Sequence, residues 1–500
     1  MICVSIGRSR HKHMLAEHKH LAEQGAKLVE LRLDYISSRV NLQRLLADRP
    51  TPVIITVRRE EDGGKFAGSE EQRMMMLREA IALGADYVDL EEDIAGKIPR
   101  YGKTKRIVSC HNFRNTPENL AVLHAAMAKL DADVVKIATM AQKPTDNIRM
   151  LRLVKDAQTP TVGMCMGDIG TPSRILGAKF GAPFTYATFH HERALAPGQL
   201  SFQQMHEVYN YDKINAATDV YGVVADPIGH SLSPQIHNAA FQAAGRDAVY
   251  LPFRVPADTL GEFMAEAASL GLRGLSVTIP HKEAIAGHLS RVDAASEEIA
   301  AVNTVVFHDG QTEGYNTDYK AAMDTLELGL CAPGEEPVPG EATRLAGKRV
   351  LVLGAGGVSR AILYGLQKRG AHAVVCSRTK SRADTLAKEL GGRAVDWGAR
   401  HNAEVDVLVN ATPIGMHPNV DETPYHKGHL RPSMVVFDTV YNPESTLLVK
   451  EAREHGCRVV TGVEMFVRQA ALQFELFTGA EPPKDVMRET LKRAIGPVKY

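Results

Sequence analysis

The chain has 500 residues, and its 59 lysines and arginines balance its 59 aspartates and glutamates, so its formal net charge is zero. This balance argues against a general nucleic-acid or anionic-membrane binder, which needs an excess of basic residues. Hydrophobic residues make up 44% of the chain, which excludes a wholly disordered protein, and no apolar run approaches the roughly 18 residues that span a bilayer.

The cysteines and the first residues indicate a cytoplasmic protein. Six cysteines are scattered along the chain without a Cys-x-x-Cys pair, which favours reduced thiols over a disulfide framework or a zinc site. The start, MICVSIGRSR, places a short apolar run before the arginines, whereas a signal peptide has the opposite order. We therefore expect a cytoplasmic location, no metal site, and small-molecule partners rather than nucleic acid or membranes.

Residues 1–212 alternate β-branched runs with helix-like stretches. Strands are predicted at 2–6, 27–33, 53–57, 87–90, 106–110, 133–138, 161–166 and 184–187. A spacing of about 25 residues leaves room for a helix after most strands. Strand–helix alternation at this count favours a (β/α)8 barrel over an open sheet.

The remainder of the chain predicts a two-domain α/β arrangement. The pattern restarts with a strand at 221–224, residues 331–346 indicate an exposed connector, and a strand at 349–353 runs into a glycine-rich turn. We place globular units at about 1–212, 218–332 and 345–470, the last of the Rossmann type. We expect the C-terminal helices at 471–500 to pack back on the middle unit.

The second predicted strand carries unexpected charges. In the segment 29–34, Glu30, Arg32 and Asp34 share one face because strand side chains alternate. One interpretation is an amphipathic surface strand. In a barrel, however, the apolar face must meet the helices, so the charged face points inward, where charges are costly unless paired or used in catalysis.

Lys136 and His111 are the first candidate catalytic residues. Lys136 lies in a run that is buried on both faces if its strand is parallel, and an apolar setting favours the neutral, nucleophilic amine over the ammonium. His111 ends the preceding strand, where barrel enzymes carry their chemistry, and could move protons beside Lys136. The alternatives are a lysine paired with a carboxylate and a core histidine bonded to a carbonyl.

Two arginines follow other strands of the predicted barrel. Arg58 ends the third strand and Arg174 follows the seventh. The fork of Arg174 would suit a carboxylate, although either arginine alone could be a surface residue.

These residues resemble type I 3-dehydroquinate dehydratases. The resembling motifs are Glu30-Leu-Arg-Leu-Asp34, Thr56-Val-Arg58, Ser109-Cys-His111, Lys136-Ile-Ala138, Ser173-Arg174 and Ala196-Pro-Gly-Gln199. The resemblance implies that Lys136 forms an imine with the ketone and that His111 moves the protons. It also implies a set of substrate-site residues: Glu30, Arg32, Arg58, Arg174 and Gln199.

The chain departs from that family at two positions. Asp62 stands where the family usually has a glutamate that supports the histidine, and Leu195 replaces a common serine. The loss of a hydrogen bond at Leu195 would weaken substrate binding.

A glycine-rich turn predicts a nucleotide site. Gly354, Ala355, Gly356, Gly357 and Val358 follow a strand and open a helical stretch, an arrangement that brings a pyrophosphate to backbone N–H groups. About 20 residues on, where an NAD enzyme carries an acidic residue, the chain has Ser377, Arg378 and Thr379. Positive charge suits a 2′-phosphate, so we predict NADP; the alternative is a solvated basic loop.

The middle unit supplies polar groups for a small substrate. Ser231 and Ser233 offer hydroxyls, or they cap a helix before Pro234. Lys282 and Asp318 could form a catalytic pair, although such pairs are more often surface salt bridges.

This half resembles shikimate dehydrogenases. The resembling stretches include Pro227–Pro234, Val277–Lys282, Ala301–Thr304, Gly314–Asp318, Gly354–Gly357, Asn410–Met416, Tyr441–Pro443 and Gly462–Ala470. The resemblance implies that Lys282 and Asp318 are catalytic. It further implies shikimate-binding residues (Ser231, Ser233, Thr278, Asn303, Gln469, with Tyr441 nearby) and cofactor-binding residues (the 354–358 turn, Ser377, Arg378, Thr379, Thr412, Met416 and Gly462).

Together the two halves resemble a bifunctional dehydratase–dehydrogenase in which one half makes the ketone that the other reduces. Two alternatives stay open: a quinate-type dehydrogenase fused to the dehydratase, and a barrel that serves only as a structural or regulatory module. Ser276 stands where the dehydrogenase family commonly has asparagine.

Overall fold

The computed structural model describes residues 1–229, 231–332, 335 and 342–496. Most of the predicted connector at 331–346 lies outside these residues. The chain forms two compact units, Met1–Gly229 with Asp247–Leu272, and His230–Arg246 with Arg273–Tyr500.

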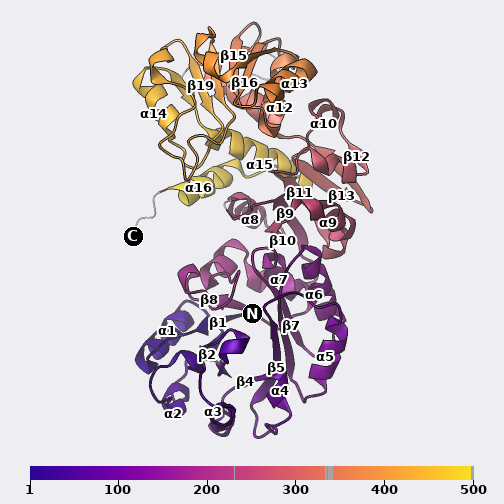
Figure 1. The fold of residues 1–500 in the computed structure, drawn as a ribbon, viewed down its shortest axis with the longest axis vertical. Helices are drawn as coiled ribbons and strands as arrows, with labels where there is room; N and C mark the ends of the chain where they lie inside the picture. Colours follow the sequence, from indigo (N-terminus) through magenta and orange to yellow (C-terminus); the bar gives the residue numbers. More distant parts are fainter. Residues whose placement is uncertain (230, 333–334, 336–341, 497–500) are drawn as a thin grey trace. The chain divides into compact units, whose positions relative to one another are not determined.

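Eight strands of the first unit form a nearly closed parallel barrel (Figure 1). Their hydrogen-bonded order is β7-β6-β5-β4-β3-β2-β1-β8, and neighbouring strands are parallel. The strands are β1 (Ile2–Ile6), β2 (Leu28–Arg32), β3 (Val53–Thr56), β4 (Tyr87–Glu91), β5 (Lys105–Asn112), β6 (Val134–Met140), β7 (Thr161–Met166) and β8 (Thr185–Thr188). The predicted barrel is therefore confirmed, with strand ends shifted by one or two residues.

One detail of the prediction is wrong. Strand β2 ends at Arg32, and Leu33–Tyr35 form a short 3-10 turn. Asp34 therefore does not belong to the strand face that carries Glu30.

Helices alternate with the strands and cover the outside of the barrel (Figure 1). They are α1 (His11–Glu23), α2 (Leu42–Leu46), α3 (Glu70–Ala82), α4 (Glu92–Ala95), α5 (Leu120–Ala128), α6 (Thr145–Asp156) and α7 (Thr171–Leu176). Helix α3 begins with a capping box, in which Ser69 and Gln72 satisfy each other's backbone N–H groups.

The barrel interior is apolar at the starts of the strands and polar further along. Buried side chains at the starts form one hydrophobic cluster that includes Cys3, Leu28, Ile54, Ile107 and Val134. Because strand side chains alternate, the residues two positions on also face inward. These residues are polar and buried: Ser5, Glu30, Thr56, Ser109 and Lys136. The apolar layer thus closes the barrel beneath a polar site at the C-terminal ends of the strands.

After the barrel, the first unit contains a parallel strand pair and a further helix. Strands β9 (Asp219–Ala225) and β10 (Ala248–Arg254) pair in parallel, and α9 (Leu260–Glu266) follows. Lys143 before α6 forms an ion pair with Glu262 of α9, with 2.6 Å between the nitrogen and the oxygen.

The second unit begins with a small α/β region. Its elements are α8 (Ser233–Ala243), β11 (Leu272–Val277), β12 (Arg291–Val292), α10 (Ala294–Ile299), β13 (Thr304–His308), β14 (Gln311–Tyr315) and α11 (Asp318–Leu330). Strands β13 and β14 form an antiparallel hairpin, whose turn at Asp309-Gly310 has positive φ at both residues, as a tight hairpin requires.

The rest of the second unit is a six-stranded parallel sheet in the Rossmann order β17-β16-β15-β18-β19-β20 (Figure 1). Its elements are β15 (Arg349–Leu353), α12 (Gly357–Lys368), β16 (His372–Ser377), α13 (Lys380–Leu390), β17 (Arg393–Asp396), β18 (Val407–Asn410), β19 (Val435–Asp438), α14 (Leu447–Glu454) and β20 (Arg458–Val460).

Two helices end the described chain, α15 (Gly462–Thr478) and α16 (Lys484–Ile495). Both contact α8, and the rings of Phe474 on α15 and Phe241 on α8 lie 5.5 Å apart. Within the described ranges, no helix has the length and apolar character that crossing a membrane requires.

Candidate active sites

Lys136 is buried inside the barrel but is not in an apolar setting. Its side chain projects from β6 and is 7% exposed, with Nζ 3.0 Å from Oδ2 of Asp89 and 3.9 Å from Oε1 of Glu30. The same nitrogen lies 4.2 Å from the ring centroid of Tyr186. The expected burial is correct, whereas the expected apolar surroundings are wrong, because the barrel brings two carboxylates to the amine.

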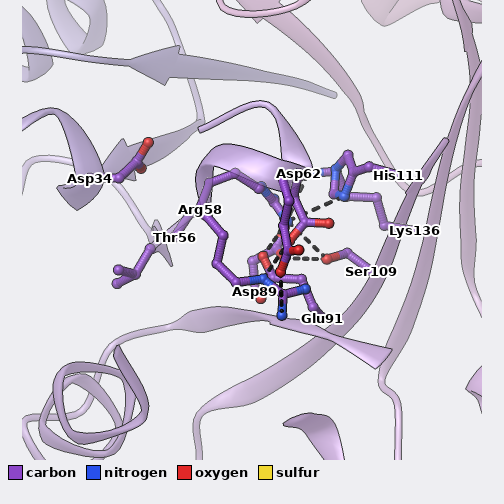
Figure 2. A network of polar contacts seen from close by, with 12 residues as sticks. Asp34, Thr56, Arg58, Asp62, Asp89, Glu91, Ser109, His111 and Lys136 are labelled. Carbon is purple, nitrogen blue, oxygen red and sulfur yellow. Dashed lines mark hydrogen bonds and ion pairs between the residues drawn. The ribbon is translucent and has the colours of Figure 1, made fainter. Parts of the chain in front are cut away.

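Arg58 lies between Asp89, the ion-pair partner of Lys136, and His111 (Figure 2). Its guanidinium lies 2.9 Å from Asp89, 2.7 Å from Glu91 and 3.3 Å from Nδ1 of His111. Burial raises the pKa of the Asp89 carboxyl, but Arg58 and Lys136 outweigh it and hold that pKa below its usual value. The carboxylate is therefore ionised between two cations.

The same surroundings keep His111 neutral. Burial first, and then the positive charges of Arg58 and Lys136, lower the pKa of His111 well below 6.5. The histidine lies on β5 two residues beyond Ser109, which pairs with Lys136 across the sheet. A neutral imidazole next to an amine can accept a proton at neutral pH.

Glu30 and Arg32 confirm the inward charged face of β2. Glu30 accepts hydrogen bonds from Ser5 (2.6 Å) and Thr56 (2.8 Å). Burial raises its pKa, but Lys136 and Arg32 outweigh burial, so that the net shift is downward. Arg32 donates two hydrogen bonds, of 2.9 and 2.8 Å, to Asp34 in the following turn.

Arg174 is a buried cation without an anionic partner. It is 2% exposed, its Nη2 donates to the carbonyl of Pro197 at 3.0 Å, and its Nε has no partner. No carboxylate of the described residues pairs with it, and burial lowers its pKa to about 10. A buried guanidinium without an anionic partner is able to bind an anion.

Asp62 does not bind the histidine that it is expected to support. Its carboxylate accepts a hydrogen bond from Arg59 at 2.7 Å, and no contact among the described residues joins it to His111. Leu195 is held by Gln199, whose Oε1 accepts from the Leu195 N–H at 2.9 Å.

One cavity collects all the barrel residues predicted for the substrate site. Its walls include Glu30, Arg32, Arg58, Asp62, His111, Lys136, Arg174, Leu195 and Gln199. The sequence analysis missed Asp89, Glu91 and Tyr186. The charges at alternate positions of β4 form the same pattern as those of β2 and could have been found. Among the residues that the structure describes, the buried Tyr186 hydroxyl has no hydrogen-bond partner.

A second polar cluster forms around Lys282 and Asp318. Nζ of Lys282 lies 2.6 Å from Oδ2 of Asp318, and the two side chains are 13% and 7% exposed, so the pair is not a surface salt bridge. Asn303 donates to Oδ1 of Asp318 at 2.9 Å. Asp318 opens α11, and Lys282 follows the end of β11.

Gln473, which the sequence analysis missed, holds this cluster from α15. It donates to the carbonyl of Asn303 and to the hydroxyl of Thr304, both at 3.1 Å, and accepts from Ser276 at 2.8 Å. The serine hydroxyl at this position donates to the glutamine, and nothing in the structure explains why serine stands here in place of asparagine.

A cavity of about 470 Å³ lies between the glycine-rich turn and Lys282. Gly354 has a φ of +114°, and a side chain there would collide with the carbonyl of Ala411, so the turn needs glycine. A Cβ on Gly357 would lie 3.2 Å from Cδ of Lys282. Predicted residues on the walls are Thr278, Lys282, Gly354, Ala355, Gly356, Gly357, Val358, Ser377, Arg378, Thr379 and Thr412.

The other predicted residues of this half lie elsewhere. Met416 and Gly462 are not on the walls of that cavity. Gln469 donates to the carbonyl of Phe466 at 3.1 Å, and the ring of Tyr441 lies 4.3 Å from that of Phe466. Burial raises the pKa of Tyr441 to about 12.

The two predicted serines sit at the start of α8. Ser233 opens the helix, and its N–H donates to Oγ of Ser231 at 3.4 Å. His230 of the same motif lies outside the described residues.

Comparison with known proteins identifies the family of each half. A model for type I 3-dehydroquinase matches residues 2–216. Models for the shikimate dehydrogenase substrate binding domain, for shikimate/quinate 5-dehydrogenase and for the shikimate 5′-dehydrogenase C-terminal domain match residues 223–305, 339–438 and 462–492.

Individual relatives extend the match to the whole chain. Among solved structures, the shikimate dehydrogenase of Thermus thermophilus in complex with NADP(H) and shikimate is 34% identical, with a TM-score of 0.50, over 55% of this chain and 99% of that one. The quinate dehydrogenase of Corynebacterium glutamicum in complex with NAD is 33% identical, with a TM-score of 0.50, over 55% and 99%. The chloroplastic bifunctional 3-dehydroquinate dehydratase/shikimate dehydrogenase of Arabidopsis thaliana is 40% identical over 99% of this chain and 84% of the relative. The chain therefore belongs to the family of bifunctional 3-dehydroquinate dehydratase/shikimate dehydrogenases.

Proposed function

We propose that the chain catalyses two consecutive reactions of the shikimate pathway. The barrel dehydrates 3-dehydroquinate to 3-dehydroshikimate, and the second unit reduces that ketone to shikimate with NADPH. The observation that carries the proposal is the buried Lys136, which shares one cavity with the neutral His111 and the unpaired Arg174.

In the dehydration, Lys136 is the nucleophile. The ammonium of Lys136 passes a proton to the neutral His111, and the free amine adds to the substrate carbonyl. Return of that proton lets the carbonyl oxygen leave as water and gives a protonated imine, the Schiff base. Arg174 binds the substrate carboxylate, because this anion offsets its buried charge. Glu30 and Arg58 lie on the walls of the same cavity and reach the substrate hydroxyls.

His111 carries the proton from the acidified carbon to the oxygen of the departing hydroxyl. The protonated imine draws electrons and acidifies the neighbouring carbon, so the neutral His111 can remove a proton there. The imidazolium then protonates the departing hydroxyl, which leaves as water. Hydrolysis of the imine consumes one water and restores Lys136, so the net reaction is the loss of one water.

The second cavity fits NADPH. Arg378 and Arg382 are exposed on its wall, and within the described residues neither has an acidic partner, which suits a 2′-phosphate. The turn at 354–357 presents backbone N–H groups at the start of α12. The bound nucleotide supplies a hydride, while Lys282, held by Asp318, donates the proton that the new hydroxyl needs.

The location and the domain division also remain proposals. We place the protein in a reducing cytoplasm, because all six cysteines are free thiols; cell fractionation tests this. The division at about 1–212, 218–332, 345–470 and 471–500 is supported by the barrel and by the Rossmann sheet.

A single coupled assay tests the function. The purified chain, given 3-dehydroquinate and NADPH, should form shikimate and consume one NADPH per product. Lys136→Met should form neither product but still reduce added 3-dehydroshikimate, whereas Lys282→Met should stop at 3-dehydroshikimate. Borohydride added with 3-dehydroquinate should leave an adduct on Lys136; an unmodified Lys136 would rule out the Schiff base.

A quinate-type dehydrogenase is the second candidate, because the Corynebacterium quinate dehydrogenase matches the same half of the chain. Oxidation rates with shikimate and with quinate decide between them. A barrel that serves only as a structural module predicts no dehydration by the full chain, and the Lys282→Met variant measures this directly.

A further inference from the structure

The nucleotide cavity contains one aromatic wall residue to which the proposed function gives no role. Trp397 is the only tryptophan of the chain and begins the 3-10 turn that follows β17. Its half-buried side chain shares the cavity wall with Ser377, Arg378 and Arg382. It is the only aromatic side chain among the described residues of that wall.

The sheet register places Trp397 beside the basic residues. Strands β16 and β17 are parallel, and Ser377 pairs with Asp396. Arg378 and Trp397 directly follow this last pair, just beyond the ends of the two strands, and neighbouring strands lie about 4.8 Å apart. A ribose with a 2′-phosphate carries its base on the adjacent carbon, so a phosphate held by Arg378 brings the base to Trp397.

Arg400 fixes the indole in place. Its guanidinium carbon lies 4.4 Å from the indole centroid, the geometry of a cation–π contact. It also donates to the carbonyls of Trp397 (2.6 Å) and Pro424 (2.8 Å). The ring packs against the hydrophobic cluster around Leu351 and Leu353. Arg400 therefore covers part of the ring and holds it in place, while the rest borders the cavity.

We propose that Trp397 stacks on the purine base of NADP(H) and is a further affinity-determining residue of the nucleotide site, with Arg400 as its positioning residue. The inference rests on the proposed NADPH-dependent reduction. The purine base would contact Trp397, the 2′-phosphate would contact Arg378, and the pyrophosphate would contact the glycine-rich turn.

The single tryptophan makes the contact directly observable. Titration of the full chain with 2′,5′-ADP, which has the base and the 2′-phosphate but no nicotinamide, should quench the tryptophan emission. Nicotinamide mononucleotide, which lacks the purine base, should not quench the tryptophan emission. If 2′,5′-ADP inhibits the reduction competitively against NADPH but leaves the emission unchanged, the stacking proposal is overturned.

Kinetics of matched variants give a second readout. Trp397→Leu should raise KM for NADPH about tenfold, since a base–aromatic stack typically contributes roughly that factor or more. The loss should fall on KM rather than on kcat. Trp397→Phe should recover most of the affinity, and Arg400→Met should give an intermediate KM. The folding control is the thermal unfolding of the second unit, which carries Trp397, because dehydration reports only on the barrel.

The outcomes separate the two proposals. An unchanged KM in Trp397→Leu, with normal NADPH turnover by the parent chain, would overturn the role of Trp397 alone. A parent chain that neither oxidises NADPH nor binds 2′,5′-ADP would overturn the proposed reduction, and this inference with it.

Discussion

Nζ of Lys136 lies 3.0 Å from Oδ2 of Asp89, and both side chains are buried in the barrel. Asp89 also pairs with Arg58, so this carboxylate is shared by two buried cations, which Glu30 and Glu91 approach as well. The ion pair with Asp89 thereby holds the Lys136 amine inside the cavity.

We expect Asp89→Asn to disable the dehydratase. Without the Asp89 carboxylate, Lys136 keeps only Glu30, at 3.9 Å, and Arg58 keeps Glu91, and loss of one partner from a buried pair costs about 3–5 kcal/mol. Dehydration should fall at least tenfold, and the barrel should be less stable to denaturant. Asp93→Asn, at an exposed partner of Arg59, is the matched control, and dehydrogenase activity reports on the second unit. Dehydration within twofold of the parent would contradict the role of the pair.

The dehydratase should stay active in mildly acidic solution. The pKa of His111 is held well below 6.5 by burial and by Arg58 and Lys136, so the imidazole stays neutral as the pH falls through that value. The acid limb of kcat should therefore lie below pH 6.5. Arg58→Met removes one of the charges and should move the limb upward, whereas the pH profile of the dehydrogenase should not change. A limb at or above 6.5 in the parent would be inconsistent with this.

Removal of Arg174 should weaken binding while stabilising the fold. Its guanidinium is buried without an anion, which is unfavourable until a carboxylate binds. Arg174→Met should raise KM for 3-dehydroquinate at least tenfold and raise Tm in the absence of substrate. Arg152→Met, at an exposed arginine, should change neither. A fall in Tm would argue for a structural role of the guanidinium.

Charge reversal at Arg378 should change the cofactor preference. An aspartate there repels a 2′-phosphate but tolerates a ribose hydroxyl. Arg378→Asp should therefore raise KM for NADPH far more than KM for NADH. Arg393→Asp, at the start of β17 and exposed, controls for a general change in charge. Equal losses with both nucleotides would reject the assignment.

Asp438 should make the Rossmann sheet less stable at neutral pH than at acidic pH. Burial raises its pKa from 3.8 to about 6, despite hydrogen bonds from Thr446, Val440 and Asn410. Because the folded pKa is raised, its contribution to stability is fully present below pH 3.8 and is lost as the pH rises through about 6.

Asp438→Asn should remove this pH dependence. A shift of about two units corresponds to about 3 kcal/mol at most, and the altered hydrogen bonds offset part of the gain. The difference in Tm between variant and parent should therefore grow between pH 4 and pH 7. A difference that is constant over that range would show that Asp438 does not titrate in this way.

The fold and many residues of the two sites could be predicted from the sequence, because the strand and helix patterns that place them are local and periodic. Alternation in β2 placed Glu30 and Arg32 inside the barrel, and the position of His111 at a strand end placed it at the mouth. Contacts that depend on closure of the barrel were less accessible. Asp89 lies 47 residues before Lys136, and only the strand order brings the two together.

Other errors have equally specific causes. Asp34 was wrongly placed on the strand face of Glu30 and Arg32, because β2 ends at Arg32 and a 3-10 turn begins at Leu33. Gln473 was missed because it lies on a helix 197 residues from Ser276, and a buried glutamine has no local pattern. Trp397 was overlooked because a lone aromatic residue after a strand usually belongs to the core.

The close approach of Gly357 to Lys282 couples two parts of the enzyme that could otherwise have changed independently. A methyl group at position 357 would lie 3.2 Å from Cδ of Lys282, so the aliphatic stem of this lysine would have to shift by a few tenths of an ångström. The start of α12 and the stem of Lys282 therefore limit each other, so a larger residue at position 357 is compatible only with a shifted Lys282 side chain.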